Sequence, residues 1–342
     1  MRTLIDLQKK LFPDLLEVMQ QRYTILNSVQ FFQPIGRRSL AEHSSLTERH
    51  VRAEVDFLHE QGLINVTSKG MLITEEGKVV VEQLSNFMKD VMGLSVLEKQ
   101  LTDKLQIGQV IVVPGNSDHH DWVKQEMGKA CVSFLKSRIP ANYTIAVTGG
   151  TTMAAVAKTM TPLDESKQYL FVPARGGIGE QVENQANTIV AEMAKKAKGD
   201  YRMLYVPDPL SEISYQTMIN EPSINEILQL IRGANVVLHG IGDAKTMAMR
   251  RKTPEQVIRK LDENNAVSEA FGYYFNKEGD VVYKVRTIGI QLEDLKTVDC
   301  VITVAGGISK AQAIASYFEQ GKSDLLITDE AAAEQILRDT SL

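Results

Sequence analysis

From Gly108 onward the chain alternates between short apolar runs and segments in which apolar residues recur at helical spacing. Short strands alternating with helices are typical of a parallel sheet with helices packed on both faces. The pattern predicts an α/β fold with a doubly wound, mostly parallel sheet, into which a β-hairpin at residues 273–283 is inserted. The expected strands cover residues 110–113, 144–147, 169–172, 203–206, 236–239, 300–304 and 325–327, and the expected helices include 125–137, 187–198 and 309–319.

Three of these strands lead into glycine turns that carry phosphate-binding residue types. The turn at 148–152 holds two glycines among threonines, the turn at 173–177 an arginine beside two glycines, and the turn at 305–310 two glycines and a lysine. Glycines allow backbone N–H groups to approach a ligand, and a helix that begins there favours an anion. Ligands in such folds lie beyond the carboxyl ends of the strands, so we expect one phosphate pocket. A purely geometric role for each turn is the alternative.

Further polar residues follow the same edge of the expected sheet. Gln185 is placed to reach sugar hydroxyls, and Glu269 to accept hydrogen bonds from them. Arg250 and Arg251 come after a fourth glycine turn, at 240–242, and are candidates for a second phosphate clamp. Ordinary structural or surface roles remain open for these residues. His239, on an apolar strand, is interpreted as a core histidine.

The first 75 residues have the element order of a winged helix-turn-helix. Helical spacing covers 14–32, a short helix is expected at 39–43 and another from Thr47 to about Gln61, and a hairpin follows at 63–73. The second helix of the motif reads bases in the major groove. Residues 1–60 carry eight Lys/Arg and eight Asp/Glu, but residues 35–52 carry four arginines against two glutamates. The candidate DNA contacts are Arg37, Arg38, Thr47, Glu48, Arg49, His50 and Arg52. A helical protein-interaction domain is the alternative.

Residues 76–106 form a helical linker with an interruption at Gly93. Its apolar stripe is longer than a single winged helix can cover, which favours pairing with a second copy of the chain. Docking onto the chain's own following domain is the alternative. Residues 107–342 then form the effector-binding and oligomerisation domain.

Composition excludes several classes of protein. The formal net charge of −5 argues against a generally basic nucleic-acid coat. No apolar run approaches the ~20 residues that span a bilayer, and no signal peptide opens the chain, so we expect a cytoplasmic protein without membrane contact. Two cysteines, Cys131 and Cys300, do not indicate a disulfide framework or a metal site, and His43, His50 and His59 lack companion ligands.

Several longer motifs carry a family resemblance. The body resembles the sugar-phosphate-binding domain of SorC/DeoR-type bacterial transcriptional regulators, which is similar to ribose-5-phosphate isomerase and glucosamine-6-phosphate deaminase. Within that family the chain is similar to a regulator of glycolytic genes. The motifs are Thr148-Gly149-Gly150-Thr151-Thr152, Pro34-Ile35-Gly36-Arg37-Arg38-Ser39-Leu40, Phe171-Val172-Pro173-Ala174-Arg175-Gly176-Gly177, Asn184-Gln185-Ala186-Asn187-Thr188, His239-Gly240-Ile241-Gly242 and Glu269-Ala270-Phe271-Gly272-Tyr273-Tyr274-Phe275.

The resemblance implies a repressor of the operon for the lower half of glycolysis. Its inducer would be fructose-1,6-bisphosphate, with no other cofactor, and its homodimer or tetramer on operator DNA would loosen when the sugar binds. Two basic clusters, Arg175 with Lys310 and Arg250 with Arg251, exceed what one phosphate needs. The implied effector contacts are Gly149, Gly150, Thr151, Thr152, Arg175, Gln185, Arg250, Arg251, Glu269 and Lys310.

An enzyme on the same fold is the main competing hypothesis. In the deaminases the Gly-Ile-Gly turn is followed by Asp-Gly-His, whereas here the run is Gly242-Asp243-Ala244-Lys245-Thr246, without the histidine. Glu269 has no visible partner for acid–base chemistry. We therefore expect a binding module without catalysis, with an isomerase, a deaminase, or a regulator that responds to a different phosphosugar as alternatives.

Overall fold

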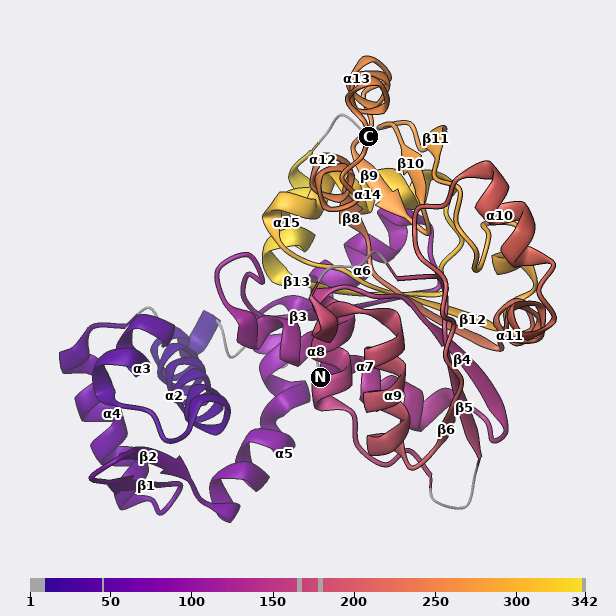
Figure 1. The fold of residues 1–342 in the computed structure, drawn as a ribbon. Helices are drawn as coiled ribbons and strands as arrows, with labels where there is room; N and C mark the ends of the chain where they lie inside the picture. The colour runs from indigo at the N-terminus through magenta and orange to yellow at the C-terminus, as the bar shows by residue number, and fades with distance from the viewer. Residues whose placement is uncertain (1–9, 45, 165–167, 178–180, 340–342) are drawn as a thin grey trace. The chain divides into compact units, whose positions relative to one another are not determined.

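The computed structural model describes residues 10–44, 46–164, 168–177 and 181–339 (Figure 1). The chain folds into two compact units, residues 1–96 and 97–342. The division falls inside the linker expected at 76–106. The expected first domain also includes residues 1–9 and 45, which lie outside the described ranges.

The amino-terminal unit is a winged helix-turn-helix, as predicted. Thr47 caps the second helix of the motif by accepting a hydrogen bond from the backbone N–H of His50 at 3.3 Å. The first helix of the motif begins at Arg37, two residues earlier than expected. A core that includes Ile25, Leu40, Val51 and Met71 joins these elements. They are α2 (Pro13–Phe32), α3 (Arg37–Ser44), α4 (Glu48–Glu60) and the antiparallel strands β1 (Ile64–Thr67) and β2 (Gly70–Ile73).

Two helices, α5 (Glu75–Val91) and α6 (Leu94–Leu105), occupy the expected linker. Gly93, with φ of +78°, separates them at the predicted interruption. On α5, Met88 and Val91 are buried in a cluster with Leu16 of α2. Helix α2 of the same chain thus covers part of the apolar stripe, so the stripe alone is a weaker reason for pairing than the sequence suggested. Dimerisation through the linker stays a prediction.

The larger unit is built on a seven-stranded sheet in which every paired strand is parallel. The spatial order is β3-β13-β12-β7-β4-β5-β6. From β4 the chain proceeds outward to β5 and β6, whereas from β7 it proceeds the other way to β12 and β13. The order therefore reverses between β4 and β7, where a doubly wound sheet forms a ligand crevice. The strands are β3 (Gln109–Val113), β4 (Tyr143–Val147), β5 (Tyr169–Pro173), β6 (Asp200–Tyr201), β7 (Val236–His239), β12 (Cys300–Val304) and β13 (Leu325–Asp329).

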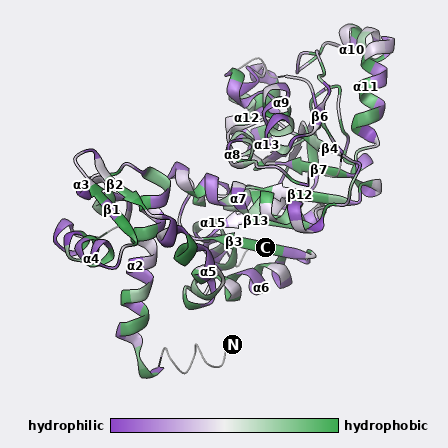
Figure 2. Ribbon diagram, turned by 90° about the horizontal axis from the view of Figure 1, so that it is seen from below, coloured by the Kyte–Doolittle hydropathy of each residue, from purple (hydrophilic) through white to green (hydrophobic). Residues whose placement is uncertain are grey.

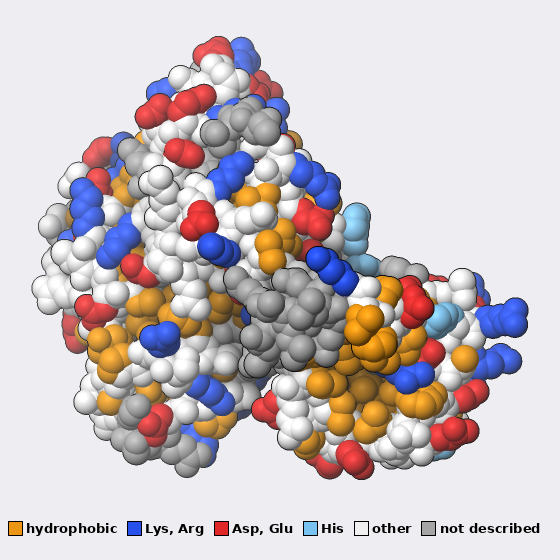
Figure 3. Space-filling view, turned by 180° about the vertical axis from the view of Figure 1, so that it is seen from behind, with side chains coloured by type: hydrophobic (Ala, Val, Ile, Leu, Met, Phe, Trp, Pro, Cys, Tyr) orange, Lys and Arg blue, Asp and Glu red, His pale blue; other side chains and the backbone are white. Residues whose placement is uncertain are grey.

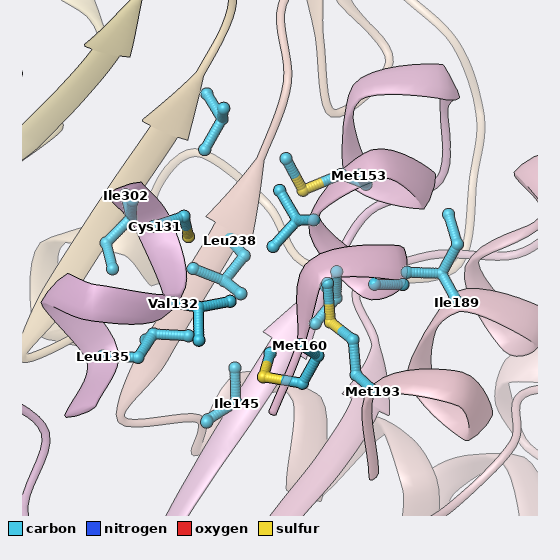
Figure 4. Packing of buried hydrophobic residues seen from close by; sticks show 14 of the residues in the cluster. Cys131, Val132, Leu135, Ile145, Met153, Met160, Ile189, Met193, Leu238 and Ile302 are labelled. Atoms are coloured by element: carbon cyan, nitrogen blue, oxygen red, sulfur yellow. The ribbon is translucent and has the colours of Figure 1, made fainter. Parts of the chain in front are cut away.

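Apolar side chains are buried on both faces of this sheet. Its central strands consist mostly of hydrophobic residues (Figure 2). On one face Ile145, Leu238 and Ile302 pack against Cys131 and Met153 of the covering helices (Figure 4). The opposite face is also covered, because the alternate residues Val237 and Val301 are fully buried. The helices of this unit are α7 (Asp121–Arg138), α8 (Thr151–Thr159), α9 (Ala186–Ala197), α10 (Glu212–Ile219), α11 (Pro222–Arg232), α14 (Ala311–Gln320) and α15 (Glu330–Arg338), with short 3₁₀ turns η1 (Val182–Asn184), η2 (Asp294–Thr297) and η3 (Ile308–Lys310).

The prediction of a strand at residues 203–206 is wrong. The edge position belongs instead to the two-residue β6, and the segment that follows is irregular. Here the side-chain amide of Asn187 takes the place of a neighbouring strand. It accepts a hydrogen bond from the backbone N–H of Leu204 at 3.0 Å and donates one to the Leu204 carbonyl at 2.9 Å. Apolar composition alone does not show this competition between a side-chain amide and a neighbouring strand.

The predicted hairpin is part of a second, antiparallel sheet of order β11-β10-β9-β8. The two strands that precede the hairpin, at residues 242–243 and 268–270, were not expected from the sequence. This insertion contains β8 (Gly242–Asp243), α12 (Ala244–Arg250), α13 (Glu255–Glu263), β9 (Ser268–Ala270), β10 (Tyr273–Phe275) and β11 (Val281–Lys284). Among the described helices, none combines the length and hydropathy needed to cross a lipid bilayer.

Candidate functional site

A cavity of about 370 Å³ opens where the strand order reverses, beyond the carboxyl ends of β4, β5, β7 and β12. Its volume suits a ligand of metabolite size. Nine of the ten predicted effector contacts line it, from segments far apart in the sequence. They are Gly149, Gly150, Thr151, Thr152, Arg175, Gln185, Arg250, Glu269 and Lys310. Arg251 does not line the cavity.

The amino terminus of α8 forms one wall. Gly150 adopts a φ of +117° with open space beside it, and it lacks a side chain that could cap the helix. The N–H groups of the first helical turn, at Thr151, Thr152 and Met153, have no acceptor within the helix and none among the other described residues. Gly149 allows close packing of the next wall, because a methyl group there would lie 2.7 Å from Asn184 O. This helix end is therefore a ready anion site.

Lys310 and Arg250 bring positive charge to the same cavity. Within the described ranges neither side chain forms a hydrogen bond or an ion pair, although both residues line the cavity. Burial and repulsion from Lys124 and Arg250 lower the pKa of Lys310, against the opposing attraction of Asp118 and Asp329. Lys310 and Arg250 are therefore electrostatically coupled to each other, and a bound dianion would relieve their repulsion.

Two aspartates that the sequence analysis missed hold the Lys310 loop. Asp329 accepts hydrogen bonds from Gly307 N at 2.7 Å and Ser117 N at 2.8 Å. Asp118 accepts two from Ser309, from its backbone N–H at 2.8 Å and its hydroxyl at 2.7 Å. Asp329 ends an apolar strand and caps α15, a position that could have drawn attention, whereas nothing in the sequence marks Asp118.

A buried charge cluster, which we define as Arg175, Asp208, Arg251 and Glu269, borders the cavity, and Arg175 and Glu269 of this cluster line it. Arg175 bonds to Asp208 through Nη2, and its Nη1 lies 3.2 Å from Glu269 Oε1. Arg251 donates to the same oxygen at 2.7 Å. Burial raises the pKa of Glu269, but Arg251 and Arg175 outweigh it, so the pKa is lowered overall.

The structure shows contacts of the arginines that the sequence did not indicate. Two carboxylates, those of Asp208 and Glu269, hold the guanidinium of Arg175, which meets Arg251 through Glu269. Arg251 does not form a second phosphate clamp with Arg250. It is 5% exposed and bonds to Glu269 and to the Tyr274 hydroxyl. The adjacent arginines point to different surroundings, which a sequence cannot reveal.

The remaining candidates behave as side chains of the wall or the core. Gln185 occupies the N-cap position of α9, without a side-chain cap hydrogen bond, and lines the cavity, as does Asn184. His239 is the core histidine that the sequence indicated: its Nε2 lies 2.7 Å from Thr303 Oγ1, and burial lowers its pKa to about 4. Among the described residues, no group of three His, Cys, Asp or Glu side chains could hold a metal ion.

The candidate DNA-binding residues lie on α3 and at the start of α4. Arg49 and Arg52 are exposed and have no ion-pair partner in the described part of the chain. Arg37 pairs with Asp56 at 3.1 Å and Arg38 with Glu42 at 3.8 Å; these exposed pairs are weak enough to open toward phosphate. Glu48 and His50 are exposed on the first turn of α4, whereas the Thr47 hydroxyl is occupied as a cap. Basic side chains project from the outer edge of this unit (Figure 3).

Comparison with known proteins matches both units. Residues 18–88 match the family model "CggR N-terminal DNA binding domain", and residues 89–338 match "Putative sugar-binding domain". The chain is 54% identical to the central glycolytic genes regulator of Priestia megaterium, over 99% of both chains. It is 52% identical to the regulator of the same name from Bacillus subtilis, over 99% of this chain and 100% of that one.

A solved structure agrees. The crystal structure of the putative SorC family transcriptional regulator from Enterococcus faecalis is 48% identical with a TM-score of 0.68, covering 71% of this chain and 99% of that chain. These are transcriptional regulators and not enzymes. The chain therefore belongs to the central glycolytic genes regulators, within the SorC family of sugar-binding transcriptional regulators.

Proposed function

We propose that this protein represses the operon for the lower half of glycolysis and releases it when fructose-1,6-bisphosphate enters the cavity of the larger unit. The observation that carries the effector assignment is the placement of Lys310 and Arg250, whose side chains have no ion-pair partner among the described residues, beside the open amino terminus of α8. Cations and helix-end N–H groups together match phosphate oxygens. The names of the relatives support the choice of genes.

A hexose bisphosphate uses the whole cavity. Its phosphates are expected at the end formed by α8, Lys310 and Arg250, and its ring hydroxyls toward Gln185 and Glu269. Glu269 is an acceptor in this proposal, because Arg251 and Arg175 lower its pKa and keep it ionised near neutral pH. A carboxylate that stays ionised and bound by two arginines is a poor proton donor or acceptor, which argues against an isomerase or deaminase at this site.

The DNA side of the proposal rests on α4. Arg49 and Arg52 are expected to contact the operator in the major groove, with Arg37 and Arg38 on phosphates. The larger unit is expected to hold two winged helices at operator spacing as a dimer, or a tetramer on DNA. Sugar binding draws the segments at 149–152, 250 and 310 together, changes the association of the larger units and so weakens operator binding.

The test is calorimetric titration of the purified protein with fructose-1,6-bisphosphate, with fructose-6-phosphate and glucosamine-6-phosphate in parallel. After each titration, the solution in the calorimeter is assayed for any isomerised or deaminated sugar phosphate. We expect the bisphosphate to bind most tightly and to remain unchanged. Tighter binding of a monophosphate would shift the proposal to another sugar operon, and turnover would favour the enzyme.

A parallel experiment tests the regulatory half. Genomic fragments retained by the protein identify the operator, and its affinity is measured by fluorescence anisotropy with and without saturating bisphosphate. We expect weaker binding with the sugar and, in sedimentation velocity, a change in the assembly on DNA. If the bisphosphate binds the protein but the operator affinity is the same with and without it, the proposal that the sugar acts as inducer is refuted.

A further inference from the structure

The start of helix α2 carries an exposed apolar surface, which we define as Leu11, Phe12 and Leu15. These residues are 70%, 52% and 64% exposed, respectively. Within the first half of α2 only Leu16 is buried, against Met88 and Val91 of α5. This end of α2 projects away from α3 and α4 (Figure 2). The elements of the DNA-binding unit thus leave the apolar surface at Leu11, Phe12 and Leu15 uncovered.

The winged-helix fold does not account for this surface. The family model of the DNA-binding domain matches residues 18–88, which begin after it. The core that joins the helices and the hairpin of this unit contains none of its three residues. Single exposed apolar residues are normal on protein surfaces, but here three lie within five consecutive positions. Such a patch is typical of a surface that meets another protein surface.

The charges beside the surface indicate what covers it. Lys10 stands two residues before Phe12, and Asp14 stands two residues after it. Both side chains are exposed, and neither forms an ion pair with any residue in the described part of the chain. If two copies of this segment meet antiparallel about a two-fold axis near Phe12, Lys10 of each copy faces Asp14 of the other. A parallel pair would instead place like charges together. The segment is therefore complementary to itself in one orientation.

We propose that the start of α2 is an interface with a second copy of the chain, in which two such segments pair antiparallel about a two-fold axis near Phe12. Leu11, Phe12 and Leu15 of the two copies bury one another, and two Lys10–Asp14 ion pairs flank them. The contact joins two DNA-binding units directly. It goes beyond the function proposed above, because it needs neither the sugar nor the operator.

Chemical cross-linking of the full chain tests the interface at one point. Phe12→Cys places a thiol next to the expected axis, and a short bifunctional maleimide then joins two copies without operator or sugar. We expect a cross-linked dimer to form at least about tenfold faster than with Val66→Cys, an exposed position on β1 of the same unit. The wild-type chain gives the background, since its Cys131 is buried and its Cys300 half-buried.

A charge exchange tests the orientation. In the Phe12→Cys chain, Lys10→Glu or Asp14→Lys turns both ion pairs into repulsive pairs, and each is expected to slow cross-linking about three- to tenfold. The two substitutions together restore opposite charges and are expected to restore the rate. A general loss of folding cannot produce this recovery.

An apolar substitution tests the burial. Leu15→Ser removes an exposed side chain and is expected to slow cross-linking about tenfold or more at the same protein concentration. Ile213→Ser, at an exposed apolar position of α10 in the larger unit, is the matched control, with an unchanged rate expected.

Each outcome decides the proposal. Cross-linking through Phe12→Cys that is no faster than through Val66→Cys would overturn it and leave the surface to another part of the same chain. Rapid cross-linking that the charge exchange does not restore would overturn the antiparallel pairing. Because neither result involves the sugar or the operator, the proposed function stands or falls separately.

Discussion

At the scale of single residues, the cavity holds buried positive charge that costs stability in the ligand-free protein and that a bound anion would offset. Lys310 is the clearest example, because burial and the neighbouring cations Lys124 and Arg250 lower its pKa. A base with a lowered pKa in the folded state destabilises the fold while it is charged, and this penalty decreases as the pH rises through its folded pKa. Selection for folding alone would not keep such a lysine unpaired.

We therefore predict opposite effects of Lys310→Met on stability and on binding. The ligand-free variant is expected to unfold at a temperature equal to or above that of the wild type, because the repulsion is gone. Its affinity for fructose-1,6-bisphosphate is expected to fall about 10–100-fold with the loss of a charge-assisted bond. Thermal melts and calorimetry measure both, with the exposed Lys195→Met as the control. A less stable variant with normal affinity would show that Lys310 is structural.

In the DNA-binding unit, some of the exposed arginines have an ion-pair partner among the described residues and others do not. Arg52 is exposed without a partner among the described residues, whereas Arg37 is shared with Asp56. We predict that Arg52→Ala weakens operator binding by about 1–3 kcal/mol and leaves sugar affinity unchanged. Fluorescence anisotropy at several salt concentrations measures the loss, with Arg232→Ala on the larger unit as the control. Unchanged operator binding would contradict the assignment of α4 as the recognition helix.

At the scale of elements, the turn between β4 and α8 depends on contact between backbones. A methyl group on Gly149 would lie 2.7 Å from Asn184 O and 3.3 Å from Ala186 N, in the segment that leads into α9. We predict that Gly149→Ala separates the walls at α8 and α9, lowers stability by about 1–3 kcal/mol and weakens sugar binding. Denaturant unfolding checks this against Gly240→Ala, whose methyl group would make only an ordinary contact at 3.5 Å. If the two variants are equally stable, the backbone at Gly149 does not approach Asn184 as closely as proposed here.

Individual strands and turns show which parts of the fold could be predicted from the sequence. Strands such as β4 and β7 are apolar runs bounded by turns, and the glycine turns mark the ligand edge, so both were predictable. The prediction of a strand at 203–206 was wrong, because the side-chain amide of Asn187 hydrogen-bonds to the backbone N–H and carbonyl of Leu204. The two-residue β8 has no periodicity to detect. Asp118 and Arg251 contact residues that are not their neighbours in the sequence, so spacing could place the edge of the sheet that carries the cavity but not the contacts of these two side chains.

At the scale of the whole molecule, the DNA-binding domain and the sugar-binding domain belong to different compact units, residues 1–96 and 97–342. A sugar can affect the operator only through a coupling free energy between the two sites, and that coupling is reciprocal. If saturating bisphosphate weakens operator binding by a given factor, saturating operator must weaken bisphosphate binding by the same factor. Such couplings are commonly about 1–3 kcal/mol, or about 5–150-fold.

We predict that the two factors, each measured by anisotropy and calorimetry, agree within error for the wild-type chain. Thr152→Ala, at the amino terminus of α8, is expected to keep operator affinity and lose the response to sugar, because it changes the effector site alone. Arg49→Ala is expected to do the converse, weakening the operator while the sugar binds as before. If Thr152→Ala instead weakened operator binding without sugar, the cavity would contribute to the DNA-binding assembly itself. Unequal coupling factors would mean that the bisphosphate also binds outside the cavity.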